Sequence, residues 1–520
     1  MFTLSLRKCT NLVRPRSLST ISIFNHSATM VFRGVPSKAC KRCRERRLRC
    51  DVQPTCGACI RANVVCSGYR DTGQLRIKDE SESVRRNVLI KKSAATSNAP
   101  SHLALSLDVQ ARESFFAHFV LGNGLGTSGA FDFLRKFHDP TEAPEFLSLT
   151  IDAASLAYLS HQSYSDTALL RAREQYTVAL KATSKALQSP DMATKETAVM
   201  ASLLLDLFEK FTNTERQELV WRSHINGALA LVKARGLQKF TDQSSLRTLV
   251  RLNTNLIISY VSTDTAVPED FSIVRAHLSK YIDTENPKWK LSGLMEPYAN
   301  LRSDIHKGIS PLECLFRAMR LDGEFQALSR EMHDKLQYKT TVRTSPSDMV
   351  YGTCYDTYLD RHVTQTWNVL RLTRIMINEF ITEACPNTAA AHTAFKNIQS
   401  LASKICASVS QYVDCAGTVA QLQKTGSPGL SRNFTCFGEC VSHLPVQNLA
   451  CYTLIFPMFV VGNAKNTASP MKIWVKKQLH YMGSHFGIRN AEIVAQILEQ
   501  GKEVSPWTIY SLLGSYAWGA

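Results

Sequence analysis

Six cysteines lie close together near the amino end of the chain and have the spacing of metal ligands. Their pattern is C-x2-C-x6-C-x5-C-x2-C-x6-C, two near-copies of one half-motif. Zinc prefers thiolates in structural sites, and C-x2-C pairs in a chain without an evident secretory signal indicate metal binding rather than disulfides. The six are Cys40, Cys43, Cys50, Cys56, Cys59 and Cys66.

Six thiolates hold two zinc ions only if two of them are shared, since two separate tetrahedral sites need about eight ligands. The repeat makes the first cysteine of each half, Cys40 and Cys56, the natural bridging pair. One ion would bind this pair with Cys43 and Cys50, and the other would bind it with Cys59 and Cys66. Because this segment is too short to bury a useful apolar core, metal binding should supply its folding free energy.

Basic residues surround the cysteines. The first 70 residues carry 14 Lys and Arg against two acids, Glu45 and Asp51, a net charge of +12. The whole chain has a charge of +17, so the remaining 450 residues contribute only +5. A basic segment attached to a nearly neutral body is typical of nucleic-acid binding at that end of the chain.

Residues 36–70 resemble the fungal zinc binuclear cluster, Zn2Cys6. All six cysteines match, Pro54 matches the proline of the loop between the halves, and the basic run 44–50 is typical. The resemblance implies two Zn²⁺ ions, a short helix at each C-x2-C pair, and double-stranded DNA with CGG triplets as the partner.

The base-reading pair of that family falls on Arg46 and Arg47. Arginine suits this role because its guanidinium can bond guanine O6 and N7 together. The other basic side chains are expected to contact phosphate, which sets position and affinity without reading sequence. These are Lys41, Arg42, Arg44, Arg49 and Arg61.

Residues 105–520 predict a large all-α regulatory domain. Apolar residues from Met200 to Phe211 recur at helical spacing, and a second stripe around Leu229 ends at Gly236. Further helices are expected over 152–187, 246–262, 311–332, 352–384, 390–423, 470–486 and 489–500, with little strand.

This body resembles the fungal-specific transcription factor domain, a helical region found behind many Zn2Cys6 clusters. The similarity is plainest at 221–228, at 366–371 and from 452–457 through 488–492. In the family the region is regulatory, which implies co-regulators as partners, and many relatives belong to gene clusters of secondary metabolism. Neither the pathway nor activation versus repression can be read from the residues.

Two flanking segments have compositions of their own. Residues 1–29 are basic, rich in Ser and Thr and free of acids, which suits a mitochondrial presequence, a disordered arm or an upstream extension with the start at Met30. We favour Met30. Residues 71–104 mix charges and predict a flexible linker. They sustain no heptads, so they give no support for a homodimer.

Three weaker signals do not change this interpretation. The G-x-G-x-x-G match at 124–129 follows an expected helix rather than a strand, and Cys436, Cys440 and His443 lack a standard zinc spacing. The apolar run 449–461 is too short for a membrane helix and contains Pro457, so it predicts a core element. No catalytic motif is evident, and we expect no enzyme.

The leading hypothesis is therefore a nuclear, zinc-dependent, sequence-specific transcription regulator acting on RNA polymerase II genes. The chief alternative is a helical ligand-binding or scaffold protein whose cluster binds nucleic acid only weakly. A large affinity ratio between CGG sites and random DNA would separate the two.

Overall fold

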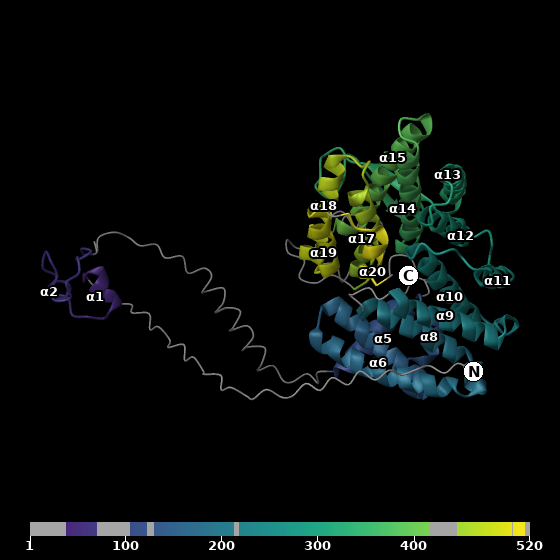
Figure 1. Cartoon of the computed structure of the whole chain (residues 1–520), viewed down its shortest axis with the longest axis horizontal. Helices are drawn as coiled ribbons and strands as arrows, with labels where there is room; N and C mark the ends of the chain where they lie inside the picture. The colour runs from purple at the N-terminus through teal and green to yellow at the C-terminus, as the bar shows by residue number, and fades with distance from the viewer. Residues whose placement is uncertain are drawn as a thin grey trace. The chain divides into compact units, whose positions relative to one another are not determined.

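The computed structural model describes residues 38–69, 105–121, 129–212, 218–414, 445–501 and 503–514. The chain divides into two compact units, Met1–Ala104 and Leu105–Ala520, whose helices Figure 1 shows. The described residues of each unit form a core of their own. The predictions for residues 1–29, 71–104 and 124–128, and for Cys436, Cys440 and His443, lie outside the described residues.

The first unit has two short helices, α1 (Lys41–Glu45) and α2 (Gly57–Ile60), which contact each other. Its core is made of sulfur rather than hydrocarbon. Cys40, Cys43, Cys56 and Cys59 are buried, and their close neighbours include Cys50 and Cys66. The predicted architecture of two short helices around a thiolate cage is confirmed.

The second unit is a helical body (Figure 1). Its buried apolar side chains form one continuous core. Helix α5 packs against α4, α6 and α8, and α8 packs against α9. Helix α10 contacts α8, α9 and α12, so it joins this group to the later helices. The early elements are α4 (Leu107–Phe115), the π-helix η1 (Phe116–Val120), the 3-10 helices η2 (Asp132–Phe137) and η3 (Pro140–Glu142), α5 (Glu145–Ser163), α6 (Asp166–Leu187), α7 (Pro190–Ala193), α8 (Glu196–Thr212), α9 (Glu218–Arg235), η4 (Leu237–Lys239) and α10 (Gln243–Ser262).

The later helices pack in sequence, α12 on α13, α13 on α14, and α14 on α15 and α17. A two-stranded antiparallel hairpin pairs Tyr338 with Tyr358 and packs on α15. The elements are α11 (Glu269–Leu278), α12 (Pro287–His306), α13 (Pro311–Lys335), β1 (Tyr338–Val342), β2 (Cys354–Tyr358), α14 (Arg361–Ala384), α15 (Ala389–Val413), α17 (Pro445–Asn463), α18 (Ser469–Phe486), α19 (Arg489–Glu499) and α20 (Pro506–Leu512).

The apolar stripe predicted from Met200 to Phe211 lies on α8 and is buried. A buried ion pair also lies on α8, with Lys210 Nζ 2.8 Å from Asp206 Oδ2. Asn255 of α10 donates a second 2.8 Å hydrogen bond to the same oxygen. Buried charges need such partners, so this contact ties α8 to α10 in one register.

The helices expected over 246–262, 311–332, 470–486 and 489–500 are confirmed. Two expected ranges were wrong in part. Helix α5 ends where Tyr164 takes a left-handed conformation (φ 50°), and Ser165 then caps α6 by accepting from the Ala168 N–H. The range 352–384 begins as strand β2, and α14 starts only after Asp360, whose carboxylate accepts from the Val363 N–H.

Helix α15 ends at Val413, and the rest of the expected range 390–423 lies beyond the described residues except for Asp414. The described part of the run 449–461 lies in α17, where Leu454, Phe456 and Phe459 are buried in the core. Among the described residues, no helix is long and apolar enough to span a membrane.

Candidate metal centre and nucleic-acid interface

The two halves of the cysteine motif share one backbone conformation. Each short helix starts directly after the first cysteine of its half. The Leu48 N–H donates to the Cys43 carbonyl at 2.8 Å, and the Val64 N–H donates to the Cys59 carbonyl at 3.2 Å. These bonds close the two helices in the same way, so the sequence repeat is also a structural repeat.

The close contacts among the thiols cross between the two halves. Cys40 Sγ lies 3.7 Å from Cys59 Sγ, and Cys43 Sγ lies 3.6 Å from Cys56 Sγ. Cys50 Sγ lies 3.5 Å from Cys56 Sγ. These are not disulfide distances, which are about 2.0 Å.

The same distances suit zinc. Two thiolates on one tetrahedral zinc, each about 2.3 Å from the metal, lie about 3.8 Å apart. The Sγ atoms of four buried cysteines, Cys40, Cys43, Cys56 and Cys59, all lie within 4.8 Å of one another. The cage therefore fits metal by the chemistry of its donors and by their spacing.

The proposed sharing of ligands agrees with these contacts. Cys40 interacts with Cys43 of its own half and with Cys59 and Cys66 of the other. Cys56 likewise contacts Cys43 and Cys50 of the first half. Each contact joins two cysteines that the bridging hypothesis assigns to one ion, so that hypothesis stays a prediction with a geometric basis.

The N-termini of the two short helices favour ionisation of the Cys40 and Cys56 thiols. The backbone N–H of Cys43 is the main cause that lowers the pKa of Cys40, to about 6, although the contact falls short of a full capping hydrogen bond. Burial opposes ionisation of Cys56, but the Cys59 N–H and the Cys50 thiol still set the pKa of Cys56 below its ordinary value. Helix N-termini stabilise thiolates, which are the form that binds metal.

The other two buried thiols titrate in the opposite direction. Burial is the main cause that raises the pKa of Cys59 to about 11, and burial also raises the pKa of Cys43. Without metal the cage therefore retains protons, which zinc binding must displace.

Two supports of the cage were missed by sequence reasoning. Asp51 Oδ2 accepts a 2.9 Å hydrogen bond from the Gly57 N–H, which caps the start of α2 and lowers the pKa of the Asp51 carboxyl. A Cβ at Gly57 would lie 2.6 Å from that oxygen, so a larger residue there would displace the Asp51 carboxylate. Arg42 Nη1 donates 3.0 Å to the Ala58 carbonyl and joins α1 to α2. Neither pairing follows a local spacing rule that could have predicted it.

The predicted DNA-contacting residues fall into two groups. Arg46, Arg47 and Arg49 are exposed at the end of α1, as are Lys41 and Arg61 elsewhere in the unit. Arg42 and Arg44 are half-buried and donate to backbone carbonyls, Arg42 to Ala58 and Arg44 to Ala39. Their predicted phosphate contacts therefore share the guanidinium with a structural role.

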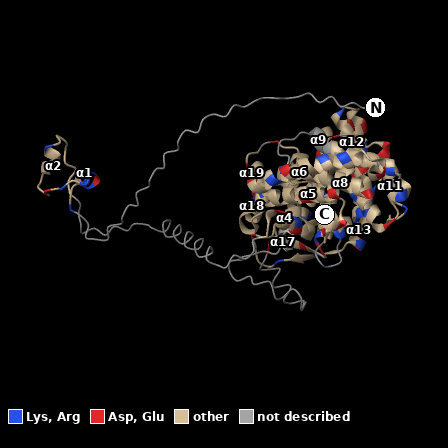
Figure 2. Cartoon of the chain, turned by 90° about the horizontal axis from the view of Figure 1, so that it is seen from below, with Lys and Arg blue, Asp and Glu red and all other residues tan. Residues whose placement is uncertain are grey.

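The two halves of the motif differ in charge although their backbone conformations are alike. Residues 41–49 contain six Lys and Arg and one acid, whereas the equivalent residues 57–65 contain Arg61 as their single charge. Lys41 lies 4.0 Å from Glu45, but both are well exposed, so the pair contributes little. In the body, by contrast, basic and acidic residues are intermixed over the face that Figure 2 shows.

The left-handed residue that follows each helix shows the same contrast. Arg47 has φ 54° and the equivalent Asn63 has φ 52°. Asparagine tolerates this conformation, but arginine is strained there by about 1–2 kcal/mol. The first half therefore keeps a guanidinium at a position that the backbone disfavours for it.

Comparison with known families supports the same assignment. Residues 38–75 match the model of the fungal Zn(2)-Cys(6) binuclear cluster domain, and residues 132–263 match that of the fungal specific transcription factor domain. No curated protein and no solved structure matches the chain.

The chain thus matches the models of two domains, which is consistent with a fungal Zn2Cys6 transcription factor. This combination supports a DNA-binding transcription regulator, with the two zinc ions characteristic of the cluster domain. The similarity noted at 221–228 lies inside the second match, while the stretches at 366–371 and 452–492 lie outside it.

Proposed function

We propose that the chain is a nuclear regulator of RNA polymerase II genes that recognises CGG-type sites through Arg46 and Arg47. The observation that carries this proposal is the asymmetry between the two halves of the cluster. The two halves have the same backbone conformation, but only residues 41–49 combine exposed arginines with a net charge of +5. Arginine is the residue best suited to reading guanine in the major groove.

Zinc would hold this surface in shape rather than read DNA itself. When bound, the two ions supply the folding free energy that the small unit lacks. The six cysteines would hold the ions, and the end of α1 would present Arg46 and Arg47 to the bases. Lys41, Arg49 and Arg61 would contact phosphate, and Arg42 and Arg44 would do so with N–H groups left by their backbone contacts.

The test compares zinc-loaded full-length chain on two duplexes, one with a CGG site and one with the triplet scrambled. Binding is measured by fluorescence anisotropy over a series of salt concentrations. A specific regulator should prefer the CGG duplex at least about a thousandfold, with a steep salt slope on both. An equal affinity for both duplexes would favour the alternative, a helical ligand-binding or scaffold protein that binds nucleic acid only weakly.

A second pair of measurements separates reading from general affinity. Arg46→Ala should weaken the CGG complex about 5- to 150-fold and reduce the preference for it. Arg61→Ala, the matched control in the second half, should weaken both complexes alike and reduce the salt slope by about one. Target genes in secondary metabolism follow from the family resemblance alone, and genome-wide mapping of bound sites tests that extension.

A further inference from the structure

The helical body contains a cavity of about 510 Å³ between α10, α12 and α14. Helix α12 contacts both α10 and α14, and η2 contacts α10 beside them. Ligand pockets commonly have volumes of about 300–1,000 Å³. The cavity therefore has the size of a small-molecule site.

The charges that line the cavity are mostly positive. Arg247 and Arg251 come from α10 and Lys288 comes from α12, while Asp132 is the single acid among the described lining residues. Asp132 is already paired with Arg247. The cations nearest the cavity thus outnumber the acids that face it.

Lys288 places a cation in the wall of the cavity. Its side chain keeps an exposed surface, yet burial within the body lowers its pKa, and Arg361 and Arg251 lower that pKa further. The two observations agree if the exposed surface faces the cavity that Lys288 lines. Asp360 acts in the opposite direction, but Lys288 forms no ion pair with any described residue.

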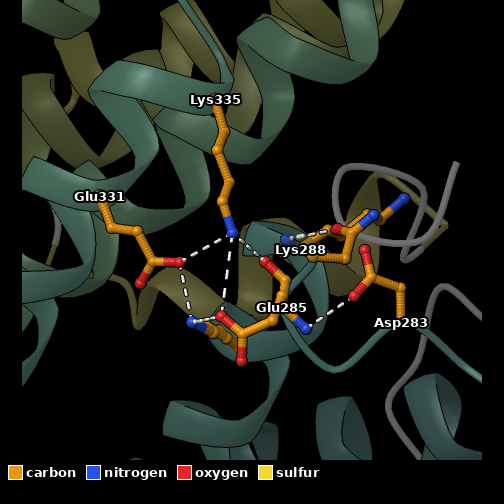
Figure 3. A network of polar contacts seen from close by, with 7 residues as sticks. Asp283, Glu285, Lys288, Glu331 and Lys335 are labelled. Carbon is orange, nitrogen blue, oxygen red and sulfur yellow. Dashed lines mark hydrogen bonds and ion pairs between the residues drawn. The ribbon is translucent and has the colours of Figure 1, made fainter.

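Two other lysines of this region, Lys290 and Lys335, differ from Lys288 because they form ion pairs. Lys290, two residues along α12, lies 2.7 Å from Glu285 and 2.8 Å from Glu331. Lys335 lies 3.1 Å from Glu331 and donates 2.7 Å to the Glu285 carbonyl (Figure 3). Glu285 and Glu331 therefore pair with these two lysines, and neither of them forms an ion pair with Lys288.

Arg361 lies next to the lining residue His362 and is not itself a lining residue. It is the first residue of α14, is 7% exposed, and its Nε and Nη1 atoms have no hydrogen-bond partner in the described part of the chain. Asp360, whose carboxylate caps α14, directly precedes Arg361 in the chain. His362 and Gln365, from the first turns of the same helix, line the cavity.

The remaining walls are apolar or neutral. Val250, Leu291 and Val369 offer hydrocarbon, and Trp289 offers an aromatic ring that is also stacked on Arg275 at 3.9 Å. The lining residue Asn253 is 2% exposed, and its Oδ1 has no hydrogen-bond partner among the described residues. A ligand that satisfies these walls carries an anionic group and an apolar body, with a hydroxyl as a suitable donor to Asn253.

We propose that this cavity binds a small organic anion, one with a carboxylate or phosphate group held by Lys288 and Arg251 and an apolar body packed between α10, α12 and α14. The proposal does not depend on the DNA sequence that the cluster recognises. It assigns the body a small-molecule ligand class rather than a further nucleic-acid surface.

The test uses the zinc-loaded full-length chain and isothermal titration calorimetry with three probes of similar shape. These are 2-naphthoate, 2-naphthyl phosphate and the neutral 2-naphthamide. At least one anionic probe should bind saturably and at least about tenfold more tightly than the amide, the difference expected of a charge-assisted hydrogen bond. A preference for naphthoate assigns carboxylate ligands, and a preference for the phosphate assigns phosphorylated ones. Equal binding of the amide, or no saturable binding of either anion, would overturn the proposal.

Two variants locate the binding. Lys288→Gln should weaken the favoured anion at least about tenfold and leave the amide unchanged. Lys290→Gln, two residues away with its charge neutralised by Glu285 and Glu331, should bind the anion within about twofold of the wild type. Equal losses in both variants would show a general charge effect and refute the site. Because the three-probe comparison needs no variant, the proposal remains testable even if Lys288→Gln folds poorly.

Discussion

Replacing Arg47 by asparagine separates DNA reading from folding. Arg47 has φ 54° in the left-handed region, which costs an ordinary residue about 1–2 kcal/mol, and asparagine adopts this region more easily. Asn63 occupies the equivalent position of the second half with φ 52°. Arg47→Asn should therefore leave the cluster at least as stable as in the wild type, while it removes the guanidinium.

The expected loss in DNA binding follows from the contact that is removed. A bidentate arginine–guanine pair contributes about 1–3 kcal/mol of discrimination, so affinity for the CGG duplex should fall about 5- to 150-fold. Affinity for the scrambled duplex should change much less. Zinc content should stay at two ions per chain, measured by atomic emission on the same samples.

The assay is fluorescence anisotropy on both duplexes over a series of salt concentrations. A base contact predicts a loss of preference with an unchanged salt slope. An equal loss on both duplexes, with the slope reduced by about one, would make Arg47 a phosphate contact and refute the reasoning. Asn63→Ala is the matched control, since it alters the same backbone position in the half with little charge and should leave the preference unchanged.

Two further predictions concern local supports of the fold. Gly57→Ala should weaken zinc retention against a competing chelator, because the new Cβ would lie 2.6 Å from Asp51 Oδ2; unchanged retention would mean that the loop yields easily. His480 of α18 lies 2.8 Å from Glu492 and 2.9 Å from Glu499 of α19, hydrogen bonds that raise its pKa. This stabilisation is present below about pH 6.5 and is lost as the pH rises through the raised folded-state pKa. His480→Gln should therefore lower the thermal midpoint more at pH 6 than at pH 8.5. The loss in the free energy of unfolding should stay below about 1 kcal/mol, because the site is exposed. An equal shift of the midpoint at both pH values would contradict this prediction.

The sequence predicted those parts of the molecule that depend on short-range spacing. Ligands three and ten residues apart within each half define the cage, and the thiols do lie together. The broad apolar stripe of α8 is equally local. The break between α5 and α6 was not predictable, because Tyr164 adopts a left-handed conformation without the glycine that usually signals one.

Features assembled from distant segments were also beyond sequence reasoning. The capping of α2 by Asp51 and the contact of Arg42 with Ala58 depend on how the two halves face each other. The cavity draws Arg251, Lys288 and His362 from three helices separated by long stretches of chain. No periodicity relates such residues, so only the packing of the helices reveals that they line one cavity.

The two units are stabilised by different interactions, and this allows the two proposals to be tested separately. The core of residues 38–69 is formed by cysteines, whereas the helical body has an extensive apolar core of its own. Removing zinc with a chelator should therefore unfold the first unit and abolish DNA binding, while the helical circular dichroism of the body persists.

Binding of the favoured naphthyl anion to the cavity should survive the same treatment, since every residue assigned to that site belongs to the body. DNA binding that persists after full zinc removal would refute the metal-dependent interface and leave the cavity proposal intact. Loss of anion binding on chelation would instead show that the cavity depends on the metal-bound unit. The apolar core of the body gives no physical reason for such a dependence.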